Sequence, residues 1–374
     1  MTGASGDYDI TDRAGYVQVY RADEDGGDRM QLGQTIYGKA TGDRFGFSVD
    51  ITIDGNVIVV GSPGYYENED RPGYVQVFSL DRDDEAGTTG TWKQIGQDIT
   101  GEAVGDEFGI SVSISYYGNA IAVGADYNDG KNGEDSGHVR IYRFNGTSWE
   151  QIGEDIDGDA AGDQSGTSVS LSENGSIVAI GAPFADIDSV LLAGQVKVYR
   201  IDSGGSNWEQ LGENIYGDNA FDVFGWSVDI SPDGNSLAVG TYGPGYMKVF
   251  SQEGGDNLGA ANWKQIGQDI TGEAIGDDFG RTVSLSYDAK TLAIGAPYAN
   301  SKNGDETGRV RVYQMDDSKS SWMQIGEVID GDAAYDVSGW SVSLSADGKT
   351  VAIGSIGNGE YGVFSGHVRV FVME

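Results

Sequence analysis

Two acidic loops contain the residue types that bind calcium in proteins. The first holds Asp126, Asn128, Asp129, Asn132 and Asp135, and the second holds Asp23, Asp25 and Asp28. Calcium is a hard cation that prefers oxygen ligands, and a chain with a net charge of −36 gains from binding it. Neither loop follows the EF-hand pattern, and Asp, Asn and Gly also form ordinary solvated turns. We predict calcium binding in both loops, with simple turn formation as the alternative.

An aspartate recurs at one position in six similar segments of the chain. The six are Asp43, Asp106, Asp163, Asp222, Asp277 and Asp336. A carboxylate at such a position accepts hydrogen bonds from backbone N–H groups and fixes a tight turn. A set of carboxylates that holds cations is the alternative. We favour the turn-fixing role, because identical turns need identical caps.

Two of the six segments carry aromatic residues where the others have mostly small or polar ones. Phe221 and Trp226 flank one turn, and Tyr335 and Trp340 flank another. Exposed aromatic rings stack on sugars or anchor protein partners, whereas buried rings fill a core. We predict that these four residues bind a protein or glycan ligand, with a structural role as the alternative.

No motif in the sequence identifies a catalytic centre. His138 and His367 share a repeat position that holds tyrosine, glutamine or arginine elsewhere, which is typical of a variable surface position. Motifs of serine hydrolases, zinc proteases, P-loop proteins and dinucleotide-binding proteins are absent in the required context. Carboxylates are so numerous that they single out no pair. We therefore predict no catalytic residues.

The composition restricts the partners of the protein. Only 23 basic residues accompany 59 acidic ones, so the electrostatic field repels phosphate backbones and anionic lipids. No apolar stretch reaches the length of a membrane span. We predict no nucleic-acid partner and no membrane insertion. Because cysteine is absent, disulfides and thiolate metal sites are excluded.

The six segments belong to repeats of about sixty residues, a period that accommodates four short strands. Each repeat alternates polar and β-branched residues, as in Ser111 to Ser115, and then has a polar turn and a second apolar run. Next come a run with the pattern of GHVRIY from Gly137 and a strand with the pattern of WEQIG from Trp149. We call these four expected strands A, B, C and D.

A four-stranded sheet with two apolar faces must stack on its neighbours, which favours a β-propeller. The sequence thus predicts an all-β fold: one β-propeller domain over residues 1–374, made of four-stranded antiparallel blades. Six blades fit the strand count best, with seven as the alternative. We expect N-terminal C and D strands to complete the last sheet, because closure by both termini removes exposed sheet edges.

The repeats resemble the FG-GAP repeats of integrin α-chain propellers. The resemblance rests on Phe-Gly pairs such as Phe108-Gly109, followed by Gly-Ala-Pro at Gly181 and Gly295 or by degenerate forms of it. With the tryptophan strand included, the chain is closer to repeat arrays of surface proteins from marine bacteria and diatoms. The integrin loop motif DxDxDGxxD has no faithful copy here.

This resemblance implies an extracellular or cell-surface propeller for adhesion or ligand binding, often with calcium in its loops. We therefore expect a non-enzymatic adhesion or recognition domain, part of a longer multidomain surface protein. Three alternatives stay open. The first is a carbohydrate-binding, lectin-like propeller, the second is a carboxylate-dependent carbohydrate-active enzyme, and the third is a purely structural element of a repeat array.

Overall fold

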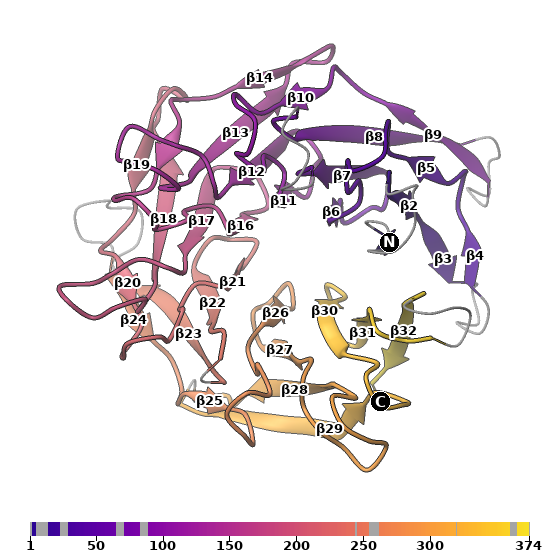
Figure 1. The fold of residues 1–374 in the computed structure, drawn as a ribbon, viewed down its shortest axis with the longest axis vertical. Helices are drawn as coiled ribbons and strands as arrows, with labels where there is room; N and C mark the ends of the chain where they lie inside the picture. Colours follow the sequence, from indigo (N-terminus) through magenta and orange to yellow (C-terminus); the bar gives the residue numbers. More distant parts are fainter. Residues whose placement is uncertain are drawn as a thin grey trace. The chain divides into compact units, whose positions relative to one another are not determined.

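Strands are the only regular elements of the described structure (Figure 1). The computed structural model describes residues 2–4, 14–22, 29–64, 71–82, 89–243, 245–253, 262–318, 320–359 and 365–373. In these ranges no segment forms a helix of the length and apolar character that a bilayer span requires. The chain divides into two compact units, Met1–Val169 with Asp202–Asn207, and Ser170–Ile201 with Trp208–Glu374.

One complete sheet of the first unit shows how a repeat folds. Its strands are β11 (Ser111–Ile114), β12 (Ala120–Ala125), β13 (His138–Phe144), β14 (Trp149–Gln151) and β15 (Ile156–Asp157). They lie in the order β11-β12-β13-β14, all antiparallel, and β15 also pairs with β13. The first three are the predicted strands A, B and C. The predicted strand D is β14, and β15 continues along β13 after a break at Gly153, whose φ is 77°.

The first unit holds a second complete sheet and the N-terminal strands. The complete sheet contains β6 (Ser48–Ile51), β7 (Val57–Ser62), β8 (Tyr74–Arg82), β9 (Gly90–Gln94) and β10 (Ile99–Thr100). The N-terminal strands are β1 (Thr2–Ala4), β2 (Tyr16–Gln18), β3 (Tyr20–Ala22), β4 (Arg29–Gln31) and β5 (Ile36–Tyr37). We expected N-terminal strands to complete the last sheet. Among the described residues they pair instead with one another, as β1-β2-β5 and β3-β4.

The remaining sheets repeat the same order. One contains β16 (Ser168–Leu171), β17 (Ile177–Ala182), β18 (Gln195–Ile201), β19 (Trp208–Gln210) and β20 (Ile215–Tyr216). The next contains β21 (Ser227–Ile230), β22 (Ser236–Gly240), β23 (Tyr246–Glu253), β24 (Asn262–Gln265) and β25 (Ile270–Thr271). The next contains β26 (Thr282–Leu285), β27 (Thr291–Ala296), β28 (Arg309–Met315) and β29 (Trp322–Asp330). The last contains β30 (Ser338–Leu344), β31 (Thr350–Ser355) and β32 (His367–Val372).

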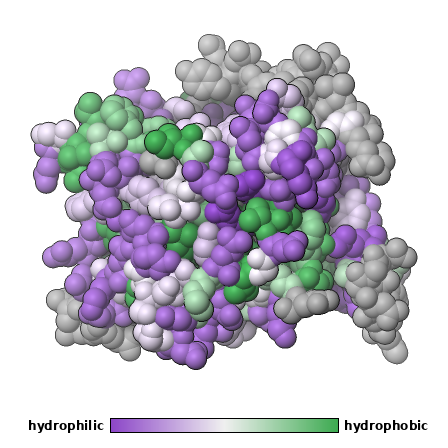
Figure 2. Space-filling view, turned by 90° about the horizontal axis from the view of Figure 1, so that it is seen from below, coloured by the Kyte–Doolittle hydropathy of each residue, from purple (hydrophilic) through white to green (hydrophobic). Residues whose placement is uncertain are grey.

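The phenylalanine of each Phe-Gly pair lies in the core between neighbouring sheets. Phe108 is fully buried and shares a cluster with Val75 of β8 and Ile121 of β12. Replacing such a ring by alanine typically costs about 3–5 kcal/mol. On the face in Figure 2, hydrophilic residues separate smaller hydrophobic groups.

Hydrogen bonds join neighbouring sheets at both ends of the repeat. Ser111 Oγ donates to the carbonyl oxygen of Gly166 at 2.6 Å, and a Cβ on Gly124 would lie 2.0 Å from the same oxygen. The sheets therefore approach too closely there for any residue larger than glycine. Near strand D, Gln97 Nε2 donates to Trp149 O at 2.7 Å, and Trp149 Nε1 donates to Ile95 O.

The predicted fold class, an all-β propeller of antiparallel blades, is confirmed, with six small sheets that each begin with an A–B hairpin. The A–B hairpins are β6–β7, β11–β12, β16–β17, β21–β22, β26–β27 and β30–β31, one for each repeat of the sequence. The last sheet contains strands A, B and C, as the sequence indicates.

Candidate functional site

The recurring aspartates fix turns, as predicted, in five of the six repeats. Asp106 Oδ2 accepts hydrogen bonds from the backbone N–H of Ala103 and from Asn128 Nδ2. The matching carboxylates of Asp43, Asp163, Asp222 and Asp336 also accept backbone N–H bonds three or four residues before them. These carboxylates are thus committed to the fold, so chemistry is to be sought where repeats differ.

The strongest such difference lies at the end of β12. Asp126 stands where Gly181-Ala182 and Gly295-Ala296 are followed by proline. Its side chain is buried, with Oδ2 accepting a hydrogen bond from Thr167 Oγ1 at 3.2 Å. Its Oδ1 is also buried and has no hydrogen-bond partner among the described residues. A buried carboxylate oxygen without a partner is costly for the fold and is expected where it serves a reaction or a ligand.

Burial raises the pKa of Asp126 to about 7. The neighbouring charges of Glu107 and Asp135 contribute to this rise, and the bond from Thr167 acts in the opposite direction. The pKa of buried Glu107 is also raised by desolvation, which the charge of Arg44 partly offsets. A carboxyl group that titrates near neutral pH can give or take a proton in a reaction.

Three of these groups come from the loops that enter three successive A strands, whereas Asp126 and Asp135 lie in the loop between β12 and β13. Arg44 and Phe47 precede β6, Glu107 precedes β11, and Thr167 precedes β16. The guanidinium carbon of Arg44 lies 4.1 Å from the centre of the Phe47 ring, which holds the positive charge in place. Together they form the acidic site, which we define as Arg44, Glu107, Asp126, Asp135 and Thr167.

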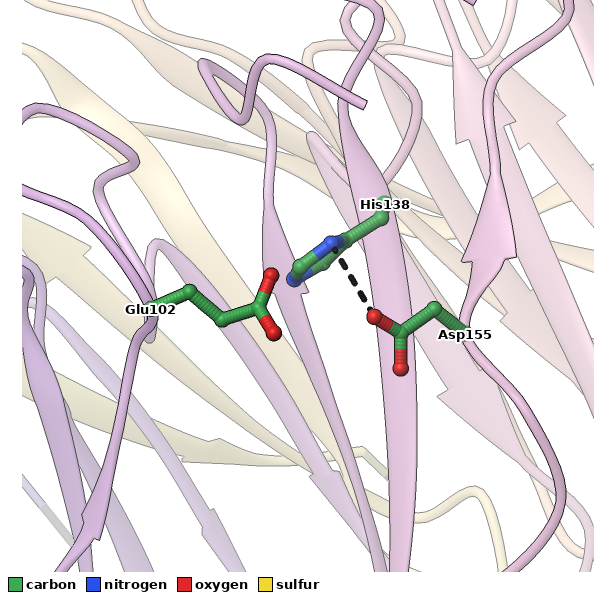
Figure 3. Close-up of side chains that lie close together, drawn as sticks. All are labelled: Glu102, His138 and Asp155. Atoms are coloured by element: carbon green, nitrogen blue, oxygen red, sulfur yellow. Dashed lines mark ion pairs between the residues drawn. The ribbon is translucent and has the colours of Figure 1, made fainter. Parts of the chain in front are cut away.

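A second cluster joins Glu102, His138 and Asp155, whose ligand-type atoms lie within 4.8 Å of one another. In Figure 3 the imidazole of His138 lies between the two carboxylates, and its Nδ1 is 3.8 Å from Asp155 Oδ2. Arg140 donates two hydrogen bonds to Asp155, at 2.9 and 2.7 Å, and also pairs with Glu102. A guanidinium therefore already neutralises both carboxylates, and a metal ion would have to displace it.

The prediction for His138 is wrong. We predicted a variable surface position, but the side chain is 1% exposed. Burial and the charge of Arg140 lower its pKa, so the imidazole is neutral at neutral pH. The position begins strand C and is surrounded by Glu102, Arg140 and Asp155, an arrangement that sequence alternation alone does not reveal.

The predicted calcium loop is held by internal hydrogen bonds. Asn132 Nδ2 donates to Gly158 O, and Asp129 Oδ1 accepts from the backbone N–H of Asp135. Asn128 uses its Nδ2 on Asp106, as described above. Calcium binding there stays a prediction. The residues of the second loop, Asp23, Asp25 and Asp28, lie outside the described residues.

The structure brings two of the four predicted ligand-binding aromatics to one group. Trp226 and Trp340 both lie against the guanidinium of Arg281, at 5.3 and 3.9 Å from its central carbon to the ring centres. Phe221 and Tyr335 are exposed turn residues with φ of 65° each, and no described contact joins them to Arg281. Sequence reasoning missed Glu107 and Arg281, although both depart from what the other repeats carry at their positions.

The comparisons with known proteins concern one repeat and the fold. Residues 100–142 match the model of the FG-GAP repeat. The chain contains an FG-GAP repeat. This confirms the predicted resemblance to FG-GAP repeats at residues 100–142. No curated protein matches the sequence significantly.

Three similar solved structures span the whole chain. A candidate 6-phosphogluconolactonase from Bacteroides uniformis has a TM-score of 0.62 and 14% identity, and the match covers 100% of this chain and 96% of that one. One from Bacteroides fragilis has a TM-score of 0.58 and 11% identity, covering 100% and 94%. The periplasmic gluconolactonase of Pseudomonas aeruginosa has a TM-score of 0.58 and 12% identity, covering 100% and 99%.

These neighbours contradict our prediction of a non-enzymatic adhesion or recognition protein, because they are named as enzymes of sugar lactones. At these sequence identities, the likeness to the three structures concerns the fold alone. The alternative of a carboxylate-dependent carbohydrate-active enzyme agrees with them better, and the acidic site supplies residues for it. The physical reason for the wrong prediction is that the repeats report how blades pack, whereas function depends on the loops between them.

Proposed function

We propose that this protein is a carbohydrate-processing hydrolase that opens sugar lactones, with Asp126 as its general base and acid. The observation that carries the proposal is the buried, unpartnered Oδ1 of Asp126, on a carboxyl group with a pKa of about 7. The names of the three similar structures support the choice of a lactone as substrate.

The reaction needs one group that moves a proton twice. Ionised Asp126 takes a proton from a water molecule while the oxygen of that water attacks the lactone carbonyl carbon. The ring C–O bond then breaks, and the proton passes from Asp126 to the departing alkoxide, which leaves a hydroxy acid. Thr167 orients the carboxylate through its bond to Oδ2, and burial, together with the charges of Glu107 and Asp135, keeps the pKa of Asp126 near neutral.

The test is hydrolysis of D-glucono-1,5-lactone by Asp126→Asn, above the spontaneous rate. Because the amide keeps the shape of the carboxylate but does not accept a proton, we expect kcat/KM to fall by at least about 100-fold. The control is Glu134→Gln, an exposed acidic residue of the same loop, which should retain full activity.

The pH profile gives an independent check. Since the base form is required, wild-type kcat/KM should rise as the pH passes about 7, the pKa of Asp126. Full activity in Asp126→Asn, or no turnover of any sugar lactone by the wild type, would remove the proposal.

Other predictions from the sequence stay proposals. We propose a glycan rather than a nucleic acid as the ligand, in keeping with the net charge of −36. An extracellular location and membership of a longer surface protein rest on the resemblance to FG-GAP arrays. Secretion of the full-length protein by its host, followed with an antibody, tests the location.

A further inference from the structure

Arg281 differs in its surroundings from the arginines of strand C. Its guanidinium carbon lies 3.9 Å from the centre of the Trp340 ring, 5.3 Å from that of Trp226 and 5.2 Å from that of Tyr242. Trp226 immediately precedes β21 and Trp340 lies in β30, the strands that contact β26 on its two sides. Aromatic rings from both neighbouring sheets therefore hold this charge.

Aromatic faces leave the N–H groups of a guanidinium without acceptors. Arg281 forms no side-chain hydrogen bond among the described residues, and its one ionic neighbour, Asp278 Oδ2, is 3.7 Å away. None of its nitrogen atoms is among the fully buried polar atoms without a partner, so solvent reaches them. The side chain is 12% exposed. Its donors are thus accessible to water or to a ligand.

The other arginines show what a purely structural role requires. Arg311 and Arg309 both pair with Glu273, and Arg309 also lies 3.3 Å from Asp330. Arg369 lies over the Phe371 ring, but it donates to Asp332 Oδ1 and Asp330 O. Arg281, by contrast, is surrounded by three aromatic rings, and its one ion pair is the long contact to Asp278.

Asp278 does not fill the role of a strong partner. Its Oδ2 is buried and has no hydrogen bond among the described residues. Burial raises the pKa of Asp278, although the charge of Arg281 opposes this shift. The carboxylate and the guanidinium are near enough to attract each other and too far apart for a fork of two hydrogen bonds.

We propose that Arg281, Trp226 and Trp340 form a subsite for the carboxylate of an acidic saccharide such as a uronic acid. The guanidinium would make two parallel hydrogen bonds to the carboxylate, and a tryptophan ring would cover the apolar face of the sugar. This subsite does not depend on the reaction proposed for Asp126.

Binding of digalacturonate, measured by calorimetry and by tryptophan fluorescence, tests the subsite. The wild type should bind it at least tenfold more tightly than its dimethyl ester, which lacks the charge. Arg281→Ala should lose at least tenfold in affinity. Arg281→Lys should have an intermediate affinity, because lysine keeps the positive charge but does not form two parallel hydrogen bonds to a carboxylate. A sulfated disaccharide probe shows whether the subsite accepts any oxyanion or selects the carboxylate.

Controls separate this result from folding and from catalysis. Arg369→Lys alters another ring-stacked arginine and should leave digalacturonate binding unchanged, and melting curves should show that every variant is folded. Asp126→Asn should also bind normally, so the subsite and the reaction can fail separately. Equal affinity for digalacturonate and its ester, unchanged binding by folded Arg281→Ala, or no binding by the wild type would overturn the proposal.

Discussion

Asp126 links stability to pH at the level of a single residue. Its pKa is raised from 3.8 to about 7 by burial, so between these values the folded protein holds a proton that the unfolded chain has released. Stability must therefore fall as the pH rises from about 4 to about 7 and level off above that. The buried carboxyl group thus destabilises the fold under the conditions in which its base form would work.

We expect Asp126→Asn to flatten this dependence. The neutral amide has no proton to lose, so its free energy of unfolding should exceed that of the wild type by up to about 4 kcal/mol at pH 8, and by far less at pH 4. Urea unfolding at several pH values measures the difference. Residual slope is expected from Glu107 and Asp135, whose pKa values are also raised. Parallel curves for the two proteins would show that Asp126 titrates normally.

A recurring glutamine joins each of several sheets to strand D of the next sheet. Gln97 donates from Nε2 to Trp149 O at 2.7 Å and accepts from Trp149 N at 3.1 Å, so it satisfies both backbone groups of a residue on β14. Gln34 with Trp92, and Gln268 with Trp322, repeat the same pair of bonds. We call this pair of hydrogen bonds the glutamine clasp. It explains why glutamine follows the strand D motif in several repeats.

Gln97→Ala should destabilise the protein by about 1–2 kcal/mol, because two hydrogen bonds between neighbouring sheets are lost and water replaces them only in part. Chemical denaturation measures the change. Glu154→Ala alters the same repeat position in the next sheet, where the side chain forms no hydrogen bond among the described residues, and should have an effect below about 0.5 kcal/mol. Equal effects would mean that the glutamine clasp contributes nothing specific.

Strands were predictable from the sequence because their signals are local. Alternation gave β11, a polar turn gave its hairpin with β12, and the tryptophan motif gave β14. The short strand β15 was missed, since Ile156–Asp157 lies in a polar stretch that reads as a connection. Asp126 and its partner Thr167 are 41 residues apart in the chain, and Trp226 and Trp340 are 55 and 59 residues from Arg281, so no local pattern predicts these contacts.

At the scale of the whole molecule, charge decides how calcium binding can be recognised. A net charge of −36 makes the folded state repel itself, and any salt relieves that repulsion by screening. A rise in melting temperature with added calcium is therefore informative only at constant ionic strength, with magnesium as the matched control.

Calcium and the proton would compete for Asp126, which among the predicted ligands in the described part of the chain is the one that is both buried and unpartnered at Oδ1. If the Asp126–Asp135 loop binds the ion, calcium at 100 times its Kd should stabilise the protein by about 2.7 kcal/mol, which magnesium at equal ionic strength should not match. The same calcium should inhibit lactone hydrolysis, because a coordinated carboxylate no longer accepts a proton. Differential scanning calorimetry with chelator, calcium or magnesium, together with the lactone assay, measures both effects. Identical melting temperatures in all three buffers would exclude a specific site, and the hydrogen bonds of Asn132 and Asp129 would then be sufficient to hold the loop.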